Sequence, residues 1–223
     1  MTHYFIEFRF QGKAKHRMKQ LIYEVDKKFR LGHTRRKRPI PHVTIIAPFY
    51  TKNQKQLVRD FNNTCSKYSL IKFKIKGYGH FDNSRVVYIN IEPSKEMKEF
   101  RKELIKKIGK TTELKEYDRG ETYSAHSTIA MKLPSAKFEK IKRYIKKKKE
   151  PSINYSMVRA TLIKGNKILY EYDFLLRKLL NRRQAKSKRL YSHTLKKLRT
   201  PSQKTIAKEL GLFSKLKKWV GLK

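Results

Sequence analysis

Apolar and polar residues alternate along several short stretches of the chain, and apolar residues recur at helical spacing in the segments between them. A period of two is typical of strands, because successive side chains point to opposite faces, and recurrence every three to four residues is typical of helices. The pattern predicts strands over 2–10, 41–49, 71–81, 85–93, 125–133, 153–164 and 167–176. It predicts helices over 13–29, 52–68, 94–109 and 135–149. This mixture of strands and helices predicts an α+β fold.

Local signals support several of these boundaries. Ser94 is a typical residue to open the helix that follows it, and Ser135 begins another helix directly after Pro134. Gly165 and Asn166 separate the last two predicted strands, as expected for the turn of a hairpin. A basic loop, GHTRRKRPIP, leads into the strand at 41–49.

Two of the predicted strands, PHVTIIAPF and AHSTIAMKL, each carry a histidine and a threonine two positions apart. Residues i and i+2 of a strand share a face, so His42 lies beside Thr44, and His126 lies beside Thr128. The apolar residues between them face the core. The two histidines are 84 positions apart, a spacing that suits two lobes built from similar units and is too long for a solenoid repeat.

Two imidazoles facing one cleft suit proton transfer at both ends of a phosphoester displacement, because the pKa of histidine is near neutrality. One ring accepts a proton from the attacking water, and the other donates a proton to the departing oxygen. The hydroxyls of Thr44 and Thr128 are placed to bind phosphate oxygens. This chemistry requires no metal or other cofactor, and His-x-Thr lacks the ligand number and spacing of a zinc site. For either motif alone, the alternative is an interior histidine with satisfied hydrogen bonds.

The chain carries 57 Lys+Arg and 18 Asp+Glu among 223 residues, for a formal net charge of +39. Such an excess favours an acidic partner, and nucleic-acid phosphate is the partner most often associated with it. A solvated lysine-rich surface is the alternative. The hydrophobic fraction of 38% is sufficient for a packed core.

The composition changes near residue 178, which predicts a domain over 1–178 and a basic helical extension over 179–223. The extension carries 14 Lys+Arg and one acidic residue, Glu209. Its apolar residues have helix-compatible spacing interrupted by Pro201, which predicts two or three short helices. Within it, SQKTIAKELGLFSKLKKWV resembles a helix-turn-helix core, so DNA reading is an alternative to binding structured RNA or to packing on the domain.

HVTI at 42–45 and HSTI at 126–129 resemble the paired His-x-Thr/Ser-hydrophobic motifs of the 2H phosphoesterase superfamily, and PHVTIIAPF resembles its 2′-5′ RNA ligase and cyclic phosphodiesterase branch. The resemblance covers residues 1 to about 178. It implies a bilobal fold of two pseudo-symmetric lobes, with antiparallel sheets lining a central cleft and helices outside. It also implies metal-independent action on RNA with 2′,3′-cyclic or 2′,5′-linked phosphates, with both histidines catalytic and both threonines on the phosphate.

The chain departs from several members of this branch, which carry an arginine shortly after a motif. Lys132 has the parity of His126 and is a candidate to replace that cation. Arg36 and Arg38, in the basic loop, are candidate contacts to RNA backbone, and Tyr123 is a candidate to stack on a base. A solvated lysine and a packed tyrosine are the alternatives.

The remaining features exclude other classes of protein. The single cysteine, Cys65, rules out an internal disulfide and a cysteine-rich zinc site, and we interpret it as structural. No apolar run reaches the length of about 18 residues that spans a bilayer, and the N-terminus does not resemble a signal peptide, so we expect a cytoplasmic protein without a membrane partner.

The two motifs and the resemblance that they carry therefore imply an RNA phosphoesterase that hydrolyses 2′,3′-cyclic phosphate ends, with formation or cleavage of 2′,5′ linkages as a related activity. The alternative is a basic RNA- or ribonucleoprotein-binding protein in which the same two motifs are idle.

Overall fold

The computed structural model describes residues 2–120 and 123–198. The predicted helix-turn-helix pattern therefore lies outside the described residues. The elements follow one another as β1 (Tyr4–Arg9), α1 (Gly12–Lys28), α2 (His33–Arg36), β2 (His42–Phe49), α3 (Gln54–Cys65), β3 (Ile71–Phe81), β4 (Val86–Pro93), α4 (Lys95–Ile108), α5 (Glu116–Arg119), β5 (His126–Ala130), α6 (Ser135–Lys146), β6 (Ser152–Met157), β7 (Arg159–Lys164), β8 (Lys167–Asp173), β9 (Lys178–Asn181), α7 (Arg182–Lys186) and α8 (Lys188–Leu198).

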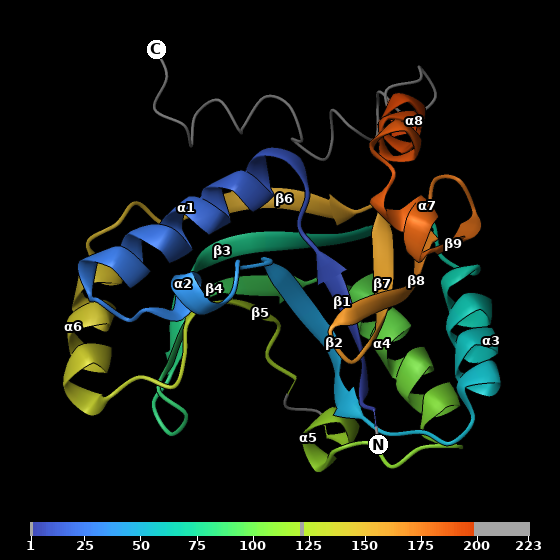
Figure 1. The fold of residues 1–223 in the computed structure, drawn as a ribbon, viewed down its shortest axis with the longest axis horizontal. Coiled ribbons are helices and arrows are strands. Elements are labelled where there is room, and N and C mark those ends of the chain that lie inside the picture. The colour runs from blue at the N-terminus through green and yellow to red at the C-terminus, as the bar shows by residue number, and fades with distance from the viewer. Residues whose placement is uncertain (1, 121–122, 199–223) are drawn as a thin grey trace.

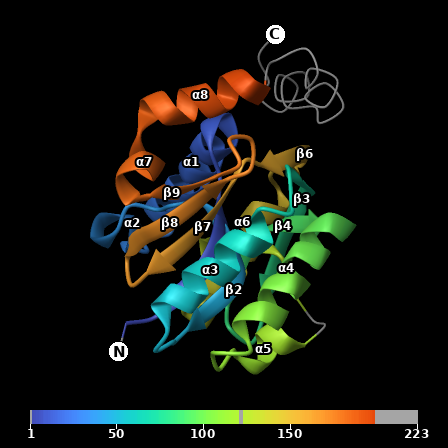
Figure 2. The same ribbon diagram turned by 90° about the vertical axis from the view of Figure 1, so that its right-hand side faces the viewer.

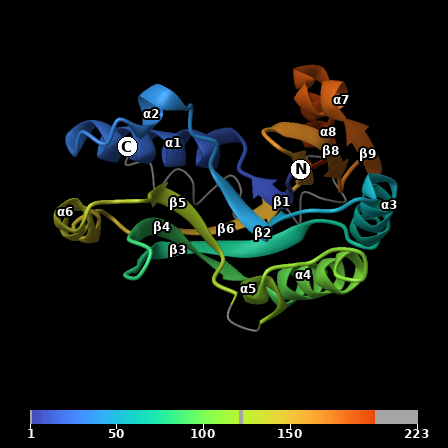
Figure 3. The ribbon, with the colours of Figure 1, turned by 60° about the horizontal axis from the view of Figure 1, so that its bottom comes forward.

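The strands form two antiparallel sheets. One has the order β2-β1-β7-β8-β9 and the other has the order β5-β4-β3-β6. Figure 3 shows the two sheets in the middle of the molecule with helices α1, α3, α4 and α6 around them. The predicted α+β class with two antiparallel sheets and outer helices is therefore confirmed.

The two halves share an order of elements that begins before each motif strand. β1, α1, α2, β2 and α3 correspond in order to β4, α4, α5, β5 and α6. In each half the motif strand lies at the edge of its sheet and pairs with the strand that starts its own unit. The long helices cross over: α1 contacts β5, and α4 contacts β2. Each motif strand is thus packed against a helix from the other half.

Several boundaries follow from local chemistry and were predicted. The Ser94 hydroxyl accepts a hydrogen bond from the backbone N–H of Met97 at 3.1 Å, which caps the start of α4. α6 begins at Ser135, and the hairpin of β7 and β8 turns at Gly165 and Asn166. Cys65 ends α3 in full burial, which raises the pKa of its thiol.

Other features differ from the predicted ones. The predicted strand over 153–164 is two strands, because the chain leaves the second sheet at Val158 and enters the first sheet as β7. A short helix, α2, lies in the predicted basic loop, and another, α5, was not predicted. These short elements contain too few residues to show a period.

An aromatic core fills the space between the sheets. Phe8 of β1 stacks on Phe100 of α4, with ring centroids 5.7 Å apart. Phe10 packs against Phe73 and Tyr155 of the other sheet at 6.0 and 5.3 Å. Each fully buried Phe contributes on the order of 1.5–3 kcal/mol through removal of apolar surface from water. This core holds the two sheets, and hence the two motif strands, together.

The first part of the predicted extension is built into the domain. β9 pairs with β8, so the sheet continues past the predicted boundary at residue 178, and helices start only at Arg182. A change in charge does not report strand pairing, which explains the difference. On α8, Leu198 packs with Leu70 and Val158 in a second apolar cluster.

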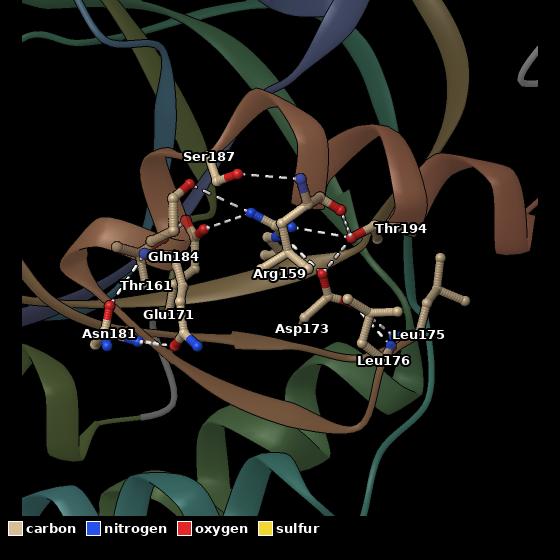
Figure 4. Close-up of polar contacts among 12 residues, drawn as sticks. Arg159, Thr161, Glu171, Asp173, Leu175, Leu176, Asn181, Gln184, Ser187 and Thr194 are labelled. Atoms are coloured by element: carbon tan, nitrogen blue, oxygen red, sulfur yellow. Dashed lines mark hydrogen bonds and ion pairs between the residues drawn. The ribbon is translucent and has the colours of Figure 1, made fainter.

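A buried polar network, shown in Figure 4, links α8 to β7 and β8 of the first sheet. Arg159 donates to Asp173 at 2.8 Å, to Glu171 at 3.1 Å and to the Thr194 hydroxyl at 2.9 Å. Thr194 in turn donates to Asp173 at 2.6 Å, and Thr161 donates to Glu171 at 2.9 Å. The Arg159 and Asp173 side chains are only 4% and 0% exposed. Burial raises the pKa of Glu171, while Arg159 opposes that shift.

Among the described residues, no helix has the length and hydropathy needed to cross a membrane.

We predict that Arg159→Met lowers the free energy of unfolding by about 3–5 kcal/mol, because Asp173 and Glu171 then lose their buried cation. Urea unfolding of wild type and variant measures this difference. Arg182→Met is the control: Arg182 is exposed and forms no ion pair with a described residue, so its change should stay within about 0.5 kcal/mol. Equal effects of the two substitutions would show that the network is not a source of stability.

Candidate active site

The first motif lies at the start of β2, an edge strand paired with β1. His42 and Thr44 are partly exposed, whereas Val43 and Ile45 are fully buried. The period of two therefore places the histidine and threonine on one face and the apolar residues in the core, as predicted.

The second motif repeats this arrangement on β5, the edge strand of the other sheet. His126 and Thr128 are partly exposed, and Ser127 and Ile129 are buried. β2 and β5 are in contact with each other, although their sheets are separate. The tertiary structure therefore brings the two motif strands side by side.

Both histidine rings are held in the same way. Nδ1 of His42 lies 2.7 Å from the backbone oxygen of Ile40, and Nδ1 of His126 lies 2.8 Å from the backbone oxygen of Ser124. A carbonyl oxygen only accepts, so Nδ1 carries the hydrogen in both rings. In the neutral state, Nε2 of each ring is then the nitrogen with a free lone pair, and it is the atom available for proton transfer.

The two imidazoles have different surroundings. His126 packs against Phe81 and Tyr88, with ring centroids 5.0 Å away in both cases. Burial lowers the pKa of His126, the Ser124 carbonyl opposes that shift, and the positive charge of His42 lowers the pKa further. In contrast, Nε2 of His42 lies 3.7 Å from a carboxylate oxygen of Glu7.

Glu7 belongs to a polar pair on β1. It lies opposite Thr44 in the sheet register, and Arg9 lies opposite His42. The Glu7 carboxylate is buried and accepts a hydrogen bond from the Arg9 guanidinium. Neither residue was predicted as part of the site, although two charged side chains in the alternating strand THYFIEFRF were an available signal.

A cavity of about 640 Å³ adjoins the motifs. Its lining includes Glu7 and Arg9 of β1, residues of the basic loop and residues of β5. Five of the predicted site residues line it: Arg36, Arg38, His42, Thr128 and Lys132. Lys132 has a φ of 55°, a left-handed conformation that residues other than glycine adopt rarely.

The lining of this cavity does not include Thr44, His126 or Tyr123. The Tyr123 hydroxyl donates to the backbone oxygen of Thr44 at 2.8 Å, and the Arg101 guanidinium lies 4.1 Å from the centroid of the Tyr123 ring. Burial raises the pKa of Tyr123. These contacts support the packing alternative for Tyr123, and base stacking stays a prediction.

Arg101 is the centre of a second set of contacts to β2. Its guanidinium donates to the backbone oxygen of Ile45 at 3.0 Å and to the Asp118 carboxylate at 3.1 Å. Asp118 also accepts from the backbone N–H of Ala47 at 3.1 Å. α4 and α5 thus hold the first motif strand through charged side chains. No local sequence pattern distinguished Arg101 and Asp118 from the other charged residues of the chain.

Within residues 2–120 and 123–198, no group of three or more His, Cys, Asp and Glu side chains is arranged to hold a metal ion.

The model of the 2′-5′ RNA ligase superfamily matches residues 16–167, which is more than half of the chain and includes both motifs. The chain belongs to this superfamily, and the resemblance to 2H phosphoesterases is confirmed. No curated protein matches the chain in sequence.

The chain is similar in fold to one solved structure and more weakly similar to two others. The protein TT0787 of Thermus thermophilus matches at 11% identity and a TM-score of 0.50, over 77% of this chain and 97% of that protein. LigT of E. coli in its apo form is 13% identical, over 77% and 96% of the two chains, with a TM-score of 0.45. Usb1 of Kluyveromyces marxianus is 11% identical, over 81% and 97%, with a TM-score of 0.44.

We predict that the pKa of His126, measured by NMR titration, lies below its ordinary value of 6.5 and rises in His42→Ala. The rise is expected because the variant removes the positive charge that disfavours protonation of His126. His16→Ala, at an exposed histidine of α1, is the control and should leave the value unchanged. A His126 pKa that is insensitive to His42→Ala would show that the two rings do not interact.

Proposed function

We propose that this protein is a metal-independent RNA phosphoesterase that hydrolyses terminal 2′,3′-cyclic phosphates. Membership of the superfamily supports phosphoesterase chemistry on RNA or nucleotide substrates. The observation that carries the proposal is the matched pair of histidines on adjoining edge strands, each with Nδ1 bonded to a backbone oxygen and Nε2 available.

The different surroundings of the two rings suggest their roles. His126, whose pKa is lowered mainly by burial, stays neutral at pH 7 and acts as the general base. His42 faces the Glu7 carboxylate, a suitable partner for a protonated imidazole, and acts as the general acid. Each proton transfer typically contributes about 10² to 10⁴ in rate.

In the proposed step, a water oxygen attacks the cyclic phosphorus while Nε2 of His126 takes a proton from that water. The bond from phosphorus to one ribose oxygen breaks, and that oxygen takes the proton from Nε2 of His42. If the 3′-oxygen leaves, the product is a 2′-phosphate. With a ribose hydroxyl in place of water, the same groups serve formation or cleavage of a 2′,5′ linkage.

The other side chains have supporting roles in this proposal. The hydroxyls of Thr44 and Thr128 bind the non-bridging phosphate oxygens as charge develops on them. Arg36, Arg38 and Lys132 line the cavity and supply positive charge for the RNA backbone. Glu7 places a carboxylate oxygen 3.7 Å from Nε2 of His42, the atom that donates the proton in this proposal.

We predict that His42→Ala and His126→Ala each reduce turnover of an RNA oligonucleotide ending in a 2′,3′-cyclic phosphate by at least about 100-fold, because each removes one proton transfer. The assay contains EDTA, and the position of the product phosphate identifies the leaving oxygen. His16→Ala is the control and should keep wild-type turnover. Normal turnover in both site variants, or strict dependence on added metal, would contradict the proposal. Absent turnover in wild type with tight RNA binding would favour the binding-protein alternative.

We also predict that the acid limb of the pH profile of kcat/KM lies below pH 6.5, because that limb reports the general base of the free enzyme and the pKa of His126 is lowered. Activity should therefore be retained as the pH falls to 6.5 and be lost only when His126 becomes protonated. The measurement is kcat/KM against pH with a cyclic-phosphate dinucleotide. An acid limb above pH 6.5 would argue against His126 as the base.

A further inference from the structure

The described part of the C-terminal segment presents a strongly basic surface. Residues 182–198 contain seven Lys or Arg residues and no Asp or Glu. All seven side chains are exposed: Arg182, Arg183, Lys186, Lys188, Arg189, Lys196 and Lys197. Of the described acidic residues, none forms an ion pair with Arg183, Arg189 or Lys196. Their charge is therefore available to an external partner.

The basic side chains gather on one side of this segment because α8 is amphipathic. Its inner face carries Thr194 and Leu198, which are buried, and its outer face carries Arg189, His193 and Lys196 at positions i, i+4 and i+7. Figure 2 shows α8 lying across one end of the molecule, with α7 turning from it toward β8 and β9.

The two helices together form a concave surface. Arg183, Gln184 and Ser187 on the α7 side face Arg189, His193 and Lys196 of α8 around one hollow. We call these six residues the α7–α8 surface. Five of them, the three cations with Gln184 and Ser187, are of the residue types that contact phosphate and sugar oxygens of nucleic acids.

The α7–α8 surface has a fixed position relative to the sheet. The buried network around Arg159 binds Thr194 of α8, and Arg159 also donates to the backbone oxygen of Ala185 in α7 at 3.4 Å. The buried charges are paired in this arrangement of α7 and α8, so we infer that the network favours that arrangement over others. A flexible basic tail that binds any polyanion needs no such network.

A row of residues across the first sheet, buried at Glu7, Thr161 and Glu171, gives the spacing between this surface and the candidate active site. Residues directly opposite in an antiparallel sheet share a face. Thr44 lies opposite Glu7, Glu7 opposite Thr161, and Thr161 opposite Glu171, which is one of the partners of Arg159. This row crosses from β2 to β8, and β9 adds one more strand before α7. Four strand spacings of about 4.8 Å give a separation of roughly 19 Å between Thr44 and β9.

We propose that the α7–α8 surface is a second binding site, which holds the phosphate backbone of single-stranded RNA some nucleotides away from the end that occupies the candidate active site. Charge complementarity selects the partner, because the hollow carries only positive and neutral side chains. The placement of the RNA end in the candidate active site rests on the proposed function, whereas RNA binding by the α7–α8 surface does not.

The test is a triple charge reversal, Arg183→Glu with Arg189→Glu and Lys196→Glu, assayed with a single-stranded RNA of about 20 nucleotides and with a cyclic-phosphate dinucleotide. Loss of three phosphate contacts should weaken binding of the long RNA at least about tenfold and reduce the slope of log K against log salt by about 2. Turnover of the dinucleotide should be unchanged, because the dinucleotide is too short to contact the α7–α8 surface from the candidate active site.

The matched control is Lys98→Glu with Lys102→Glu and Lys106→Glu, on the exposed side of α4. It changes the net charge by the same amount, and α4 lies apart from α8 in both views of the molecule (Figures 1 and 2). We expect a clearly smaller loss of RNA affinity in this control. Equal losses in the two triple variants, or no loss in the first, would overturn the second site. If wild type fails to turn over the dinucleotide, the proposed function fails, and the binding comparison still decides this proposal.

Discussion

The backbone of β2 is the constraint on which the candidate site depends. An edge strand leaves part of its backbone without a strand partner, and polar backbone groups that are buried in this state are costly. Here Tyr123 donates to the Thr44 oxygen, Arg101 donates to the Ile45 oxygen, and Asp118 accepts from the Ala47 N–H. These side chains all come from the second of the two corresponding halves, which begins at β4. The strand that carries His42 is therefore held by the half that carries His126.

These contacts between the two halves explain how two edge strands from separate sheets keep His42 and His126 in fixed positions relative to each other. The helices support it, since α1 contacts β5 and α4 contacts β2. The Nδ1 bonds to Ile40 and Ser124 then set the ring orientations. The Nδ1 bonds of the two rings are alike, but their surroundings differ, because a carboxylate lies near one ring and two aromatic side chains pack against the other. Such a difference suits acid–base catalysis, in which one group acts in its neutral form and the other in its protonated form.

Buried charge recurs in this protein as a means of fixing position. Arg101 with Asp118 fixes β2, and Arg159 with Asp173 and Glu171 fixes α7 and α8. Both arginines donate to carboxylates and to neutral acceptors, which offsets part of the cost of desolvation. The net charge of the chain is +39, and among the Lys and Arg residues that the structure describes only Arg101 and Arg159 are buried, each with a buried acidic partner.

The sequence by itself determined the features that depend on near neighbours. The alternation of apolar residues placed His42 with Thr44 and His126 with Thr128 on partly exposed faces, and Ser94 and the Gly165–Asn166 turn marked boundaries correctly. Only the tertiary structure decided that β2 and β5 lie together, that Glu7 faces His42, that the chain changes sheets at Val158 and that β9 extends the first sheet. The physical reason is range. A period or a cap is set by a few consecutive residues, whereas the partner of an edge strand or of a buried charge is set by the packing of segments far apart in the chain.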